Sequence, residues 1–372
     1  MAYEDLFPPV DLDWHAKVRR RFGAAFVGGE FDHITVDPMM LSFAAVQCGF
    51  TVRDFYERPE LGVHCLAHIY QLYDLLPVTH WIPSLPWLTD LGVELRTMEH
   101  IAPVPKAPIV LEPEDVDTLR VPDVEEIRKG WTYQHLTRAY DHTIEHLRKF
   151  HVPIAYGIEL IGGAAELCGV DNYIMWTMVE KEAAHKLKDI YRETAVNGAV
   201  AIASNYCSAM VSSGAVLANN DIFPDEIIRE FAAPNLRQFV EQSFKRGAGP
   251  QLFYHFCGNH ETSYKVYREH MMLSPFTVVH IGYKGRDPFP SGLLKEEFGK
   301  LATIMGSVDT KLFVLSDPKA VYERSRDQIL AGRDSQCGYV LGTACEIPPY
   351  SFPGNLQAMN QAARDFGSKG MW

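Results

Sequence analysis

The sequence predicts an α/β protein, a closed (β/α)8 TIM barrel with an N-terminal helical extension. Three observations predict this fold. Short apolar segments of strand character alternate with helical segments along most of the chain. The strand segments are apolar on both faces, which is typical of a parallel sheet covered by helices. An open doubly wound sheet is the alternative, but no predicted strand leads into a G-x-G-x-x-G turn or a phosphate-binding loop.

The N-terminal part, residues 1–90, is predicted to be an extension that shapes the mouth of the barrel. Residues 91–372 are predicted to form the catalytic barrel, and the whole chain a single compact domain. In the extension, we expect helices near 11–21, 40–48 and 59–75, with strands in FDHITVDP (31–38) and VTHWIPS (78–84). With those that follow, the chain holds about seven or eight βα units.

The rest of the chain alternates regularly between the two kinds of element. The segment 131–150 places its apolar residues on one helical stripe. Pro224, Pro318 and Pro353 stand where proline favours the first turn of a helix. Further helices are expected at about 180–203, 224–245, 293–301, 317–330 and 353–366. Strands are expected at 152–160, 212–220, 250–257, 276–283, 302–309 and 337–345.

Composition narrows the possible functions. A hydrophobic content of 47% supports a sizeable core and excludes general disorder. The net charge of −12 argues against nucleic-acid binding. The acidic N-terminus does not resemble a signal peptide, and no stretch is long and apolar enough for a membrane span. Seven scattered cysteines without a C-x-x-C pair favour reduced thiols in the cytoplasm.

Reactive side chains gather where the predicted strands end, which is where a barrel places its active site. His255 and Cys257 are two residues apart on one strand, so both side chains point to the same face. Cys345 follows the last strand and completes a His/Cys/Cys set, which suits zinc with one open position. From spacing alone, a core histidine beside a buried cysteine remains the alternative. Other candidates at strand ends are Tyr156, Glu159, Asp221, His280 and Glu346.

Two stretches carry a resemblance to a known family. GYVLGTACEIPPYSFPGNLQAM (338–359) and the D-x-L-x-V-P-D phrase within 91–126 resemble the uroporphyrinogen decarboxylase superfamily. The decarboxylases of this superfamily use no metal and bind a tetrapyrrole through an arginine-rich N-terminal motif, which this sequence lacks. Its other branch contains zinc-dependent, corrinoid-linked methyltransferases. Their ligands, H-x-C and a cysteine near the C-terminus, match His255, Cys257 and Cys345.

The resemblance implies methyl transfer from a methylated donor to the cobalt(I) of a corrinoid. No D-x-H-x-x-G motif for cobalamin is present, so the corrinoid is expected on a partner protein. Aromatic and methionine residues of the extension favour an aryl methyl ether as the donor, with this chain as an O-demethylase component. The residues in question are Phe31, Met39, Met40, Phe43, Phe55, Tyr56, Trp81 and Trp87.

Three alternatives stay open: a coenzyme M type methyltransferase acting on a thiol, a metal-free decarboxylase, and a non-catalytic binding subunit. Among the candidate catalytic residues, Tyr156 is expected to hydrogen-bond a leaving oxygen, and His280 either contacts the substrate or fills the barrel. Glu159, Asp221 and Glu346 are candidates for a fourth, displaceable ligand. His260 is either a group that supports the ligands or a surface loop histidine.

Overall fold

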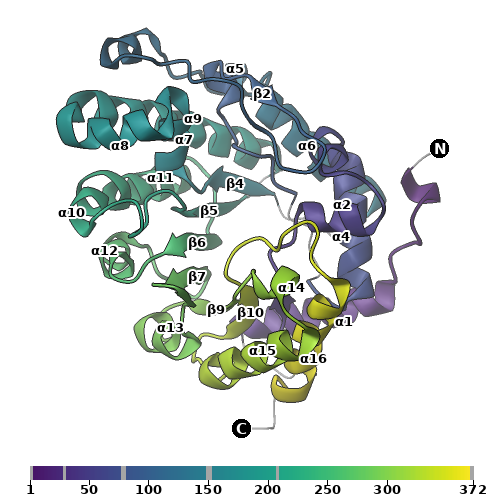
Figure 1. The fold of residues 1–372 in the computed structure, drawn as a ribbon. Coiled ribbons are helices and arrows are strands. Elements are labelled where there is room, and N and C mark those ends of the chain that lie inside the picture. Colours follow the sequence, from purple (N-terminus) through teal and green to yellow (C-terminus); the bar gives the residue numbers. More distant parts are fainter. Residues whose placement is uncertain (1–2, 28–30, 77–80, 148–152, 207–208, 369–372) are drawn as a thin grey trace. The chain divides into compact units, whose positions relative to one another are not determined.

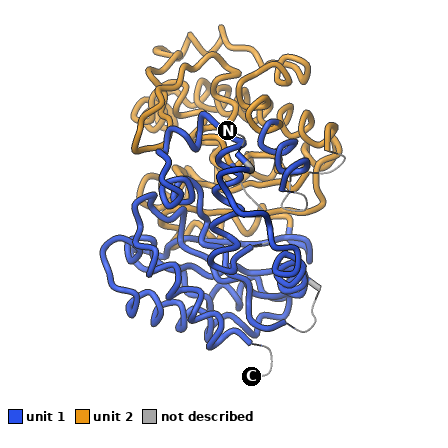
Figure 2. Tube along the Cα trace, turned by 90° about the vertical axis from the view of Figure 1, so that its right-hand side faces the viewer, with its two compact units in different colours: residues 1–81, 138–152, 273–372 blue, residues 82–137, 153–272 orange. Residues whose placement is uncertain are grey.

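The computed structural model describes residues 3–27, 31–76, 81–147, 153–206 and 209–368. Its contacts divide the chain into two compact units, which Figure 2 colours separately. The first unit combines residues 1–81, 138–152 and 273–372, and the second combines 82–137 and 153–272. The predicted division at residue 90 stays a prediction.

The sheet is built from parallel strands (Figure 1). In the second unit, β4 pairs with β5 and β5 with β6. In the first, β1 pairs with β10, β10 with β9 and β9 with β7, while the short β8 adds an antiparallel partner to β7. The strands are β1 Val36–Asp37, β4 Ile154–Gly157, β5 Met210–Ala215, β6 Leu252–Asn259, β7 Thr277–Lys284, β8 Asp287–Pro288, β9 Thr303–Val308 and β10 Tyr339–Thr343; the two-stranded β2 Leu95–Arg96 and β3 Val104–Pro105 lie apart.

Helices occupy the connections between these strands. The longest, α9 Lys181–Tyr206, packs on β4, and α11 Ala233–Lys245 packs on both β5 and α9. The remaining α-helices are α1 Leu12–Val27, α2 Ser42–Gln47, α3 Val52–Glu57, α4 Pro59–Leu72, α5 Val124–Ile127, α6 Trp131–His146, α7 Leu160–Cys168, α8 Val170–Val179, α10 Asp225–Ile227, α12 Ser263–His270, α13 Ser291–Phe298, α14 Leu312–Leu315, α15 Pro318–Gly332 and α16 Pro353–Phe366. Short 3-10 turns lie at Tyr3–Asp5, Thr89–Leu91 and Pro113–Thr118, and a π turn at Ile228–Ala232. Within the described ranges, no helix is long and apolar enough to cross a membrane.

The predicted α/β class with parallel strands is confirmed. The strand order is β1-β10-β9-β7-β6-β5-β4. The helix starts are well predicted where proline marks them: α15 begins at Pro318 with Asp317 capping its first turn, and α16 begins at Pro353.

Some strand boundaries differ from the prediction. The strand expected at 212–220 is β5 Met210–Ala215, because the backbone turns after Ala215 into a loop held by Asn219. The strand expected at 152–160 ends at Gly157, because Glu159 adopts a left-handed conformation and caps α7. In VTHWIPS, residues 78–80 lie outside the described residues, and 81–84 are not in a strand.

Candidate metal centre

The H-x-C pair lies on β6, which continues to Asn259, two residues beyond the predicted end of this strand. Strand β6 pairs in parallel with β5, with His255 opposite Gly214. His255 is 4% exposed, and Cys257 is half-buried. Because side chains alternate along a strand, these two project from the same face of the sheet.

Gly214 lets β5 approach the backbone of His255. Its φ is +153°, and a Cβ at this position would lie 1.7 Å from the carbonyl oxygen of His255. No side chain fits there, so glycine is required for the observed register. Gly214 is not among the site residues predicted from the sequence, although a glycine inside an apolar strand is the usual sign of a close backbone approach.

The turn after β6 is held by a histidine. The ring of His260 lies with Nε2 2.9 Å from the carbonyl oxygen of Cys257 and Nδ1 2.9 Å from Oγ of Ser263. Since a carbonyl only accepts, Nε2 donates and Nδ1 accepts from the hydroxyl. Burial lowers the pKa of His260 to about 4, so the ring is neutral at pH 7. His260 is 0% exposed, so the alternative of a surface loop histidine is wrong.

Cys345 lies two residues beyond β10. The hydroxyl of Thr343 donates to the carbonyl oxygens of Cys345 and of Pro38, which fixes the start of this loop. Oε1 of Glu346 accepts from the backbone and hydroxyl of Ser42 at the start of α2. Burial, together with the neighbouring Cys345, raises the pKa of Glu346 to about 8. Glu346 therefore joins this loop to the start of α2, and its predicted role as a fourth ligand stays a prediction.

The structure groups the three predicted metal ligands. One donor atom from each of His255, Cys257 and Cys345 lies within 4.8 Å of the others. One imidazole nitrogen and two thiol sulfurs form a donor set of borderline softness, which fits zinc better than magnesium or calcium. Three protein donors leave one position for a substrate or a water.

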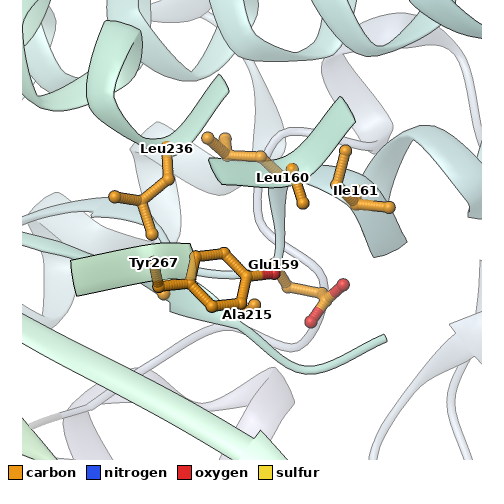
Figure 3. Close-up of a pocket in the computed structure, with 8 residues that line it drawn as sticks. Glu159, Leu160, Ile161, Ala215, Leu236 and Tyr267 are labelled. Atoms are coloured by element: carbon orange, nitrogen blue, oxygen red, sulfur yellow. The ribbon is translucent and has the colours of Figure 1, made fainter. Parts of the chain in front are cut away.

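Glu159 lies just beyond the end of β4 and contacts the loop that follows β5. Its carboxylate accepts from the backbone N–H of Gly162 at 2.6 Å and of Leu217 at 2.8 Å. Burial raises its pKa to about 7, although these hydrogen bonds oppose the shift. Glu159 also lines a cavity of about 10 Å³, room for about one water molecule, with Tyr267 beside it (Figure 3).

The other candidates have separate local surroundings. Tyr156 is buried on β4. Asp221 is exposed, and its Oδ1 accepts from the amide of Asn259 at 2.9 Å. His280 is fully buried on β7, where Nε2 lies 2.9 Å from Oγ of Ser307. Their predicted roles stay predictions.

Comparison with known proteins identifies the family. Residues 18–366 match the uroporphyrinogen decarboxylase (URO-D) family, and the chain therefore belongs to it. This confirms the resemblance found in the sequence, and the two relatives described next are both methyltransferases, as that resemblance implied.

The first relative is a curated methylated-thiol–coenzyme M methyltransferase from Methanosarcina mazei, 27% identical over 209 residues. The match covers 54% of this chain and 50% of that protein, so the chain spans about half the length of the curated relative it matches. The second is a solved methyltransferase structure, also from Methanosarcina mazei, with a TM-score of 0.75 at 17% identity. It covers 94% of this chain and 98% of its own, which shows a shared fold.

Proposed function

We propose that this chain is a zinc-dependent methyltransferase that moves a methyl group from a methylated donor to the cobalt(I) of a corrinoid on a separate protein. The observation that carries the proposal is the donor set of one imidazole and two thiols on β6 and just beyond β10. Membership of the URO-D family and the similarity to two methyltransferases support it.

In this proposal His255, Cys257 and Cys345 hold the ion. Bound zinc would supply Lewis acidity to an oxygen or sulfur atom of the donor molecule. The neutral ring of His260 fixes the carbonyl of Cys257 and so orients that ligand. Glu159, with a pKa of about 7, is able to hold or release a proton near neutral pH, and we propose it as the proton-handling group.

The remaining candidate residues are proposed to act on the substrate or on the metal ion. Tyr156 is proposed to hydrogen-bond the leaving atom, and His280 to contact the substrate. Asp221 is proposed as a displaceable fourth ligand, because its exposed side chain is accessible. A cytoplasmic location belongs to the same proposal, since the six described cysteines are all free thiols.

The donor is proposed to be an aryl methyl ether, with a methylated thiol as the second candidate. Two observations favour the thiol. The curated relative is named for a methylated thiol. Six of the eight aromatic and methionine residues that suggested a flat substrate are buried in the core: Met40, Phe43, Phe55, Tyr56, Trp81 and Trp87. The two indole N–H groups donate to the carbonyls of Phe55 and Tyr156, so these tryptophans serve packing.

Methyl transfer to free cob(I)alamin tests the proposal. The zinc-loaded chain is incubated with an aryl methyl ether or a methylated thiol, and methylcobalamin formation is followed by absorbance. We expect turnover with one donor class and its loss in Cys257→Ser, with Cys337→Ser as the matched control because that thiol lies outside the donor set. Turnover that survives Cys257→Ser, or decarboxylation of uroporphyrinogen without metal, would contradict the proposal.

A further inference from the structure

Helices α4 and α6 lie side by side and in register (Figure 1). Arg138 of α6 forms a two-pronged ion pair with Glu60 of α4, at 2.7 and 2.8 Å. One turn further along both helices, Nε2 of His142 lies 2.9 Å from Nε2 of His64. Both pairs are 78 residues apart in sequence, so the two helices advance in the same direction with a constant offset.

The next turn repeats the pattern with histidines on both helices. Positions 68 and 146 share the offset of 78 residues, and each is four residues beyond the histidine that its own helix contributes to the His64–His142 pair. Residues four apart lie on one face of a helix. We call His64, His68, His142 and His146 the histidine array. It is separate in sequence from the His/Cys/Cys set, and nothing in the proposed function uses it.

His142 is the centre of the array. Its ring centre lies 4.9 Å from that of His64 and 4.3 Å from that of His146. His64 is 4% exposed, whereas His146 lies in the last turn of α6 with its side chain 32% exposed. Phe7 stacks on His64 with the ring centres 5.5 Å apart and thereby covers one side of the array. The three imidazoles therefore form a row, from the buried His64 through His142 to the half-exposed His146.

The arrangement of His64 and His142 is close to that of two histidines bound to one metal ion. Two Nε2 atoms facing at 2.9 Å share one proton, because two protonated rings would repel each other. When two imidazoles bind one tetrahedral ion with metal–nitrogen bonds of about 2.0–2.1 Å, their nitrogens are about 3.3 Å apart. Replacing the shared proton by an ion therefore requires only a small opening of the pair.

A third imidazole lies on the same helix but does not converge with the other two in this structure: among the described residues, three such donor atoms lie within 4.8 Å of one another only at His255, Cys257 and Cys345. The spacing of His142 and His146, four residues apart, is the spacing at which two histidines of one helix bind a single ion. His146 has to turn toward His142, away from Glu145, whose carboxylate is 3.6 Å from its Nε2. Its position in the exposed last turn permits this movement. His68 lies on the same face of α4, and its Nδ1 is buried with no hydrogen-bond partner in the structure.

We propose that the histidine array is a second metal site, an all-nitrogen site for one divalent transition ion of the zinc, cobalt or nickel type. His64, His142 and His146 are its ligands, and His68 lies beside them. The ion joins α4 to α6 at the turn that follows the Glu60–Arg138 ion pair. Imidazole donors without carboxylate or thiolate select these ions over magnesium and calcium.

Cobalt(II) titration of a tag-free chain tests the site. Cys257→Ser and Cys345→Ser are introduced together to remove the thiol donors, and Co2+ is added to this double variant. We expect about one Co2+ per chain with ligand-field absorption and no sulfur-to-cobalt charge-transfer band, because imidazoles alone ligate it. The unfolding temperature of the double variant should rise with added Zn2+, since an ion that binds only the folded chain stabilises it.

Matched variants on α6 decide the ligands. His146→Gln, at a half-exposed position, and His142→Gln should each weaken Co2+ binding by at least about tenfold. His135→Gln is the control, because that histidine belongs to the same helix but bonds to the carbonyl of Trp131. Absence of Co2+ binding in the double variant would overturn the proposal and leave a simple hydrogen bond between His64 and His142. Unchanged Co2+ binding in His146→Gln would overturn the proposal as well. An unchanged unfolding temperature would show that this variant keeps its fold.

Discussion

Gly214 sets the separation of β5 and β6 at the first residue of the H-x-C pair. A methyl group on this residue would meet the carbonyl oxygen of His255 at 1.7 Å, which is far inside van der Waals contact. The backbone has to move to relieve such an overlap, and the moving segment carries two of the proposed ligands.

We therefore predict that Gly214→Ala destabilises the fold by about 1–3 kcal/mol through overpacking and weakens zinc binding. Gly292→Ala is the control, because Gly292 lies in α13 and an added Cβ would meet only Ala331 at 3.9 Å. Chemical denaturation and a competitive zinc-chelator titration measure both effects. Equal stability and zinc affinity in the two variants would show that the approach of β5 to His255 is unimportant.

At the scale of elements, Asn355 joins the last helix, α16, to helix α14 and to Ser316, which follows α14. Its amide donates to the carbonyl oxygens of Leu312, Phe313 and Ser316. The side chain of Asn355 is fully buried, and its hydrogen bond to Phe313 is buried as well. Its partners lie about 40 residues earlier in the chain, so no local pattern reveals them.

Asn355→Ala should lower the free energy of unfolding by about 1–3 kcal/mol, because it removes a side-chain donor from three carbonyl groups. The carbonyls of Leu312 and Phe313 keep backbone donors, from Ser316 and Phe352, so the main loss is at Ser316. Gln357→Ala is matched to it on the same helix but is exposed, and its effect should stay within about 0.5 kcal/mol. Urea denaturation of both variants measures the difference. A neutral Asn355→Ala would mean that α14 and α16 are held by packing alone.

The elements differ in how far the sequence predicts them. Helices with a proline in the first turn, such as α15 and α16, begin where predicted, because this start signal is local. Strand ends are less certain: β5 ends at Ala215 because of loop contacts of Asn219 that no periodicity reveals. Helix α3 was not expected, although Thr51 and Asp54 form a capping box at its start.

At the scale of the whole molecule, a buried ion cluster connects α1 to the segment after α4. The guanidinium of Arg21 is 1% exposed and bonds to both oxygens of Asp32 and of Asp74. Burial alone would raise the pKa of Asp74, but hydrogen bonds from His33, Arg21 and Trp14 hold it well below its usual range. Arg21 of α1 therefore has a structural role.

Because the pKa of the Asp74 carboxyl is lowered in the folded state, the stability of the fold depends on pH. The contribution of Asp74 is fully present above the unfolded-state pKa near 3.8 and is lost as the pH falls below that value. Arg21→Met should cost about 3 kcal/mol at pH 7 by leaving carboxylates unpaired, and should reduce the loss of stability between pH 4 and 2. Arg326→Met, whose ion pair with Asp327 is exposed, should change little. Thermal unfolding across this pH range measures both, and an acid response that is unchanged in Arg21→Met would contradict the account.

The candidate site is predicted by the sequence only in part. The positions of His255 and Cys257 two apart on a strand place both on one face without any knowledge of the tertiary structure. The burial of His260 and the requirement for glycine at position 214 depend on contacts between separate segments, which periodicity does not reveal. The histidine array depends on the register between two helices 78 residues apart, so local spacing indicates only one half of it at a time.

The central claim is the metal centre, and X-ray absorption at the zinc edge tests it most directly. The chain is prepared in the His142→Gln background, to remove the second site, and loaded with one equivalent of Zn2+. We predict two sulfur ligands at about 2.3 Å and nitrogen or oxygen ligands at about 2.0–2.1 Å, with one sulfur lost in Cys345→Ser. A spectrum without sulfur, or a chain that retains no zinc after reconstitution, would contradict the account.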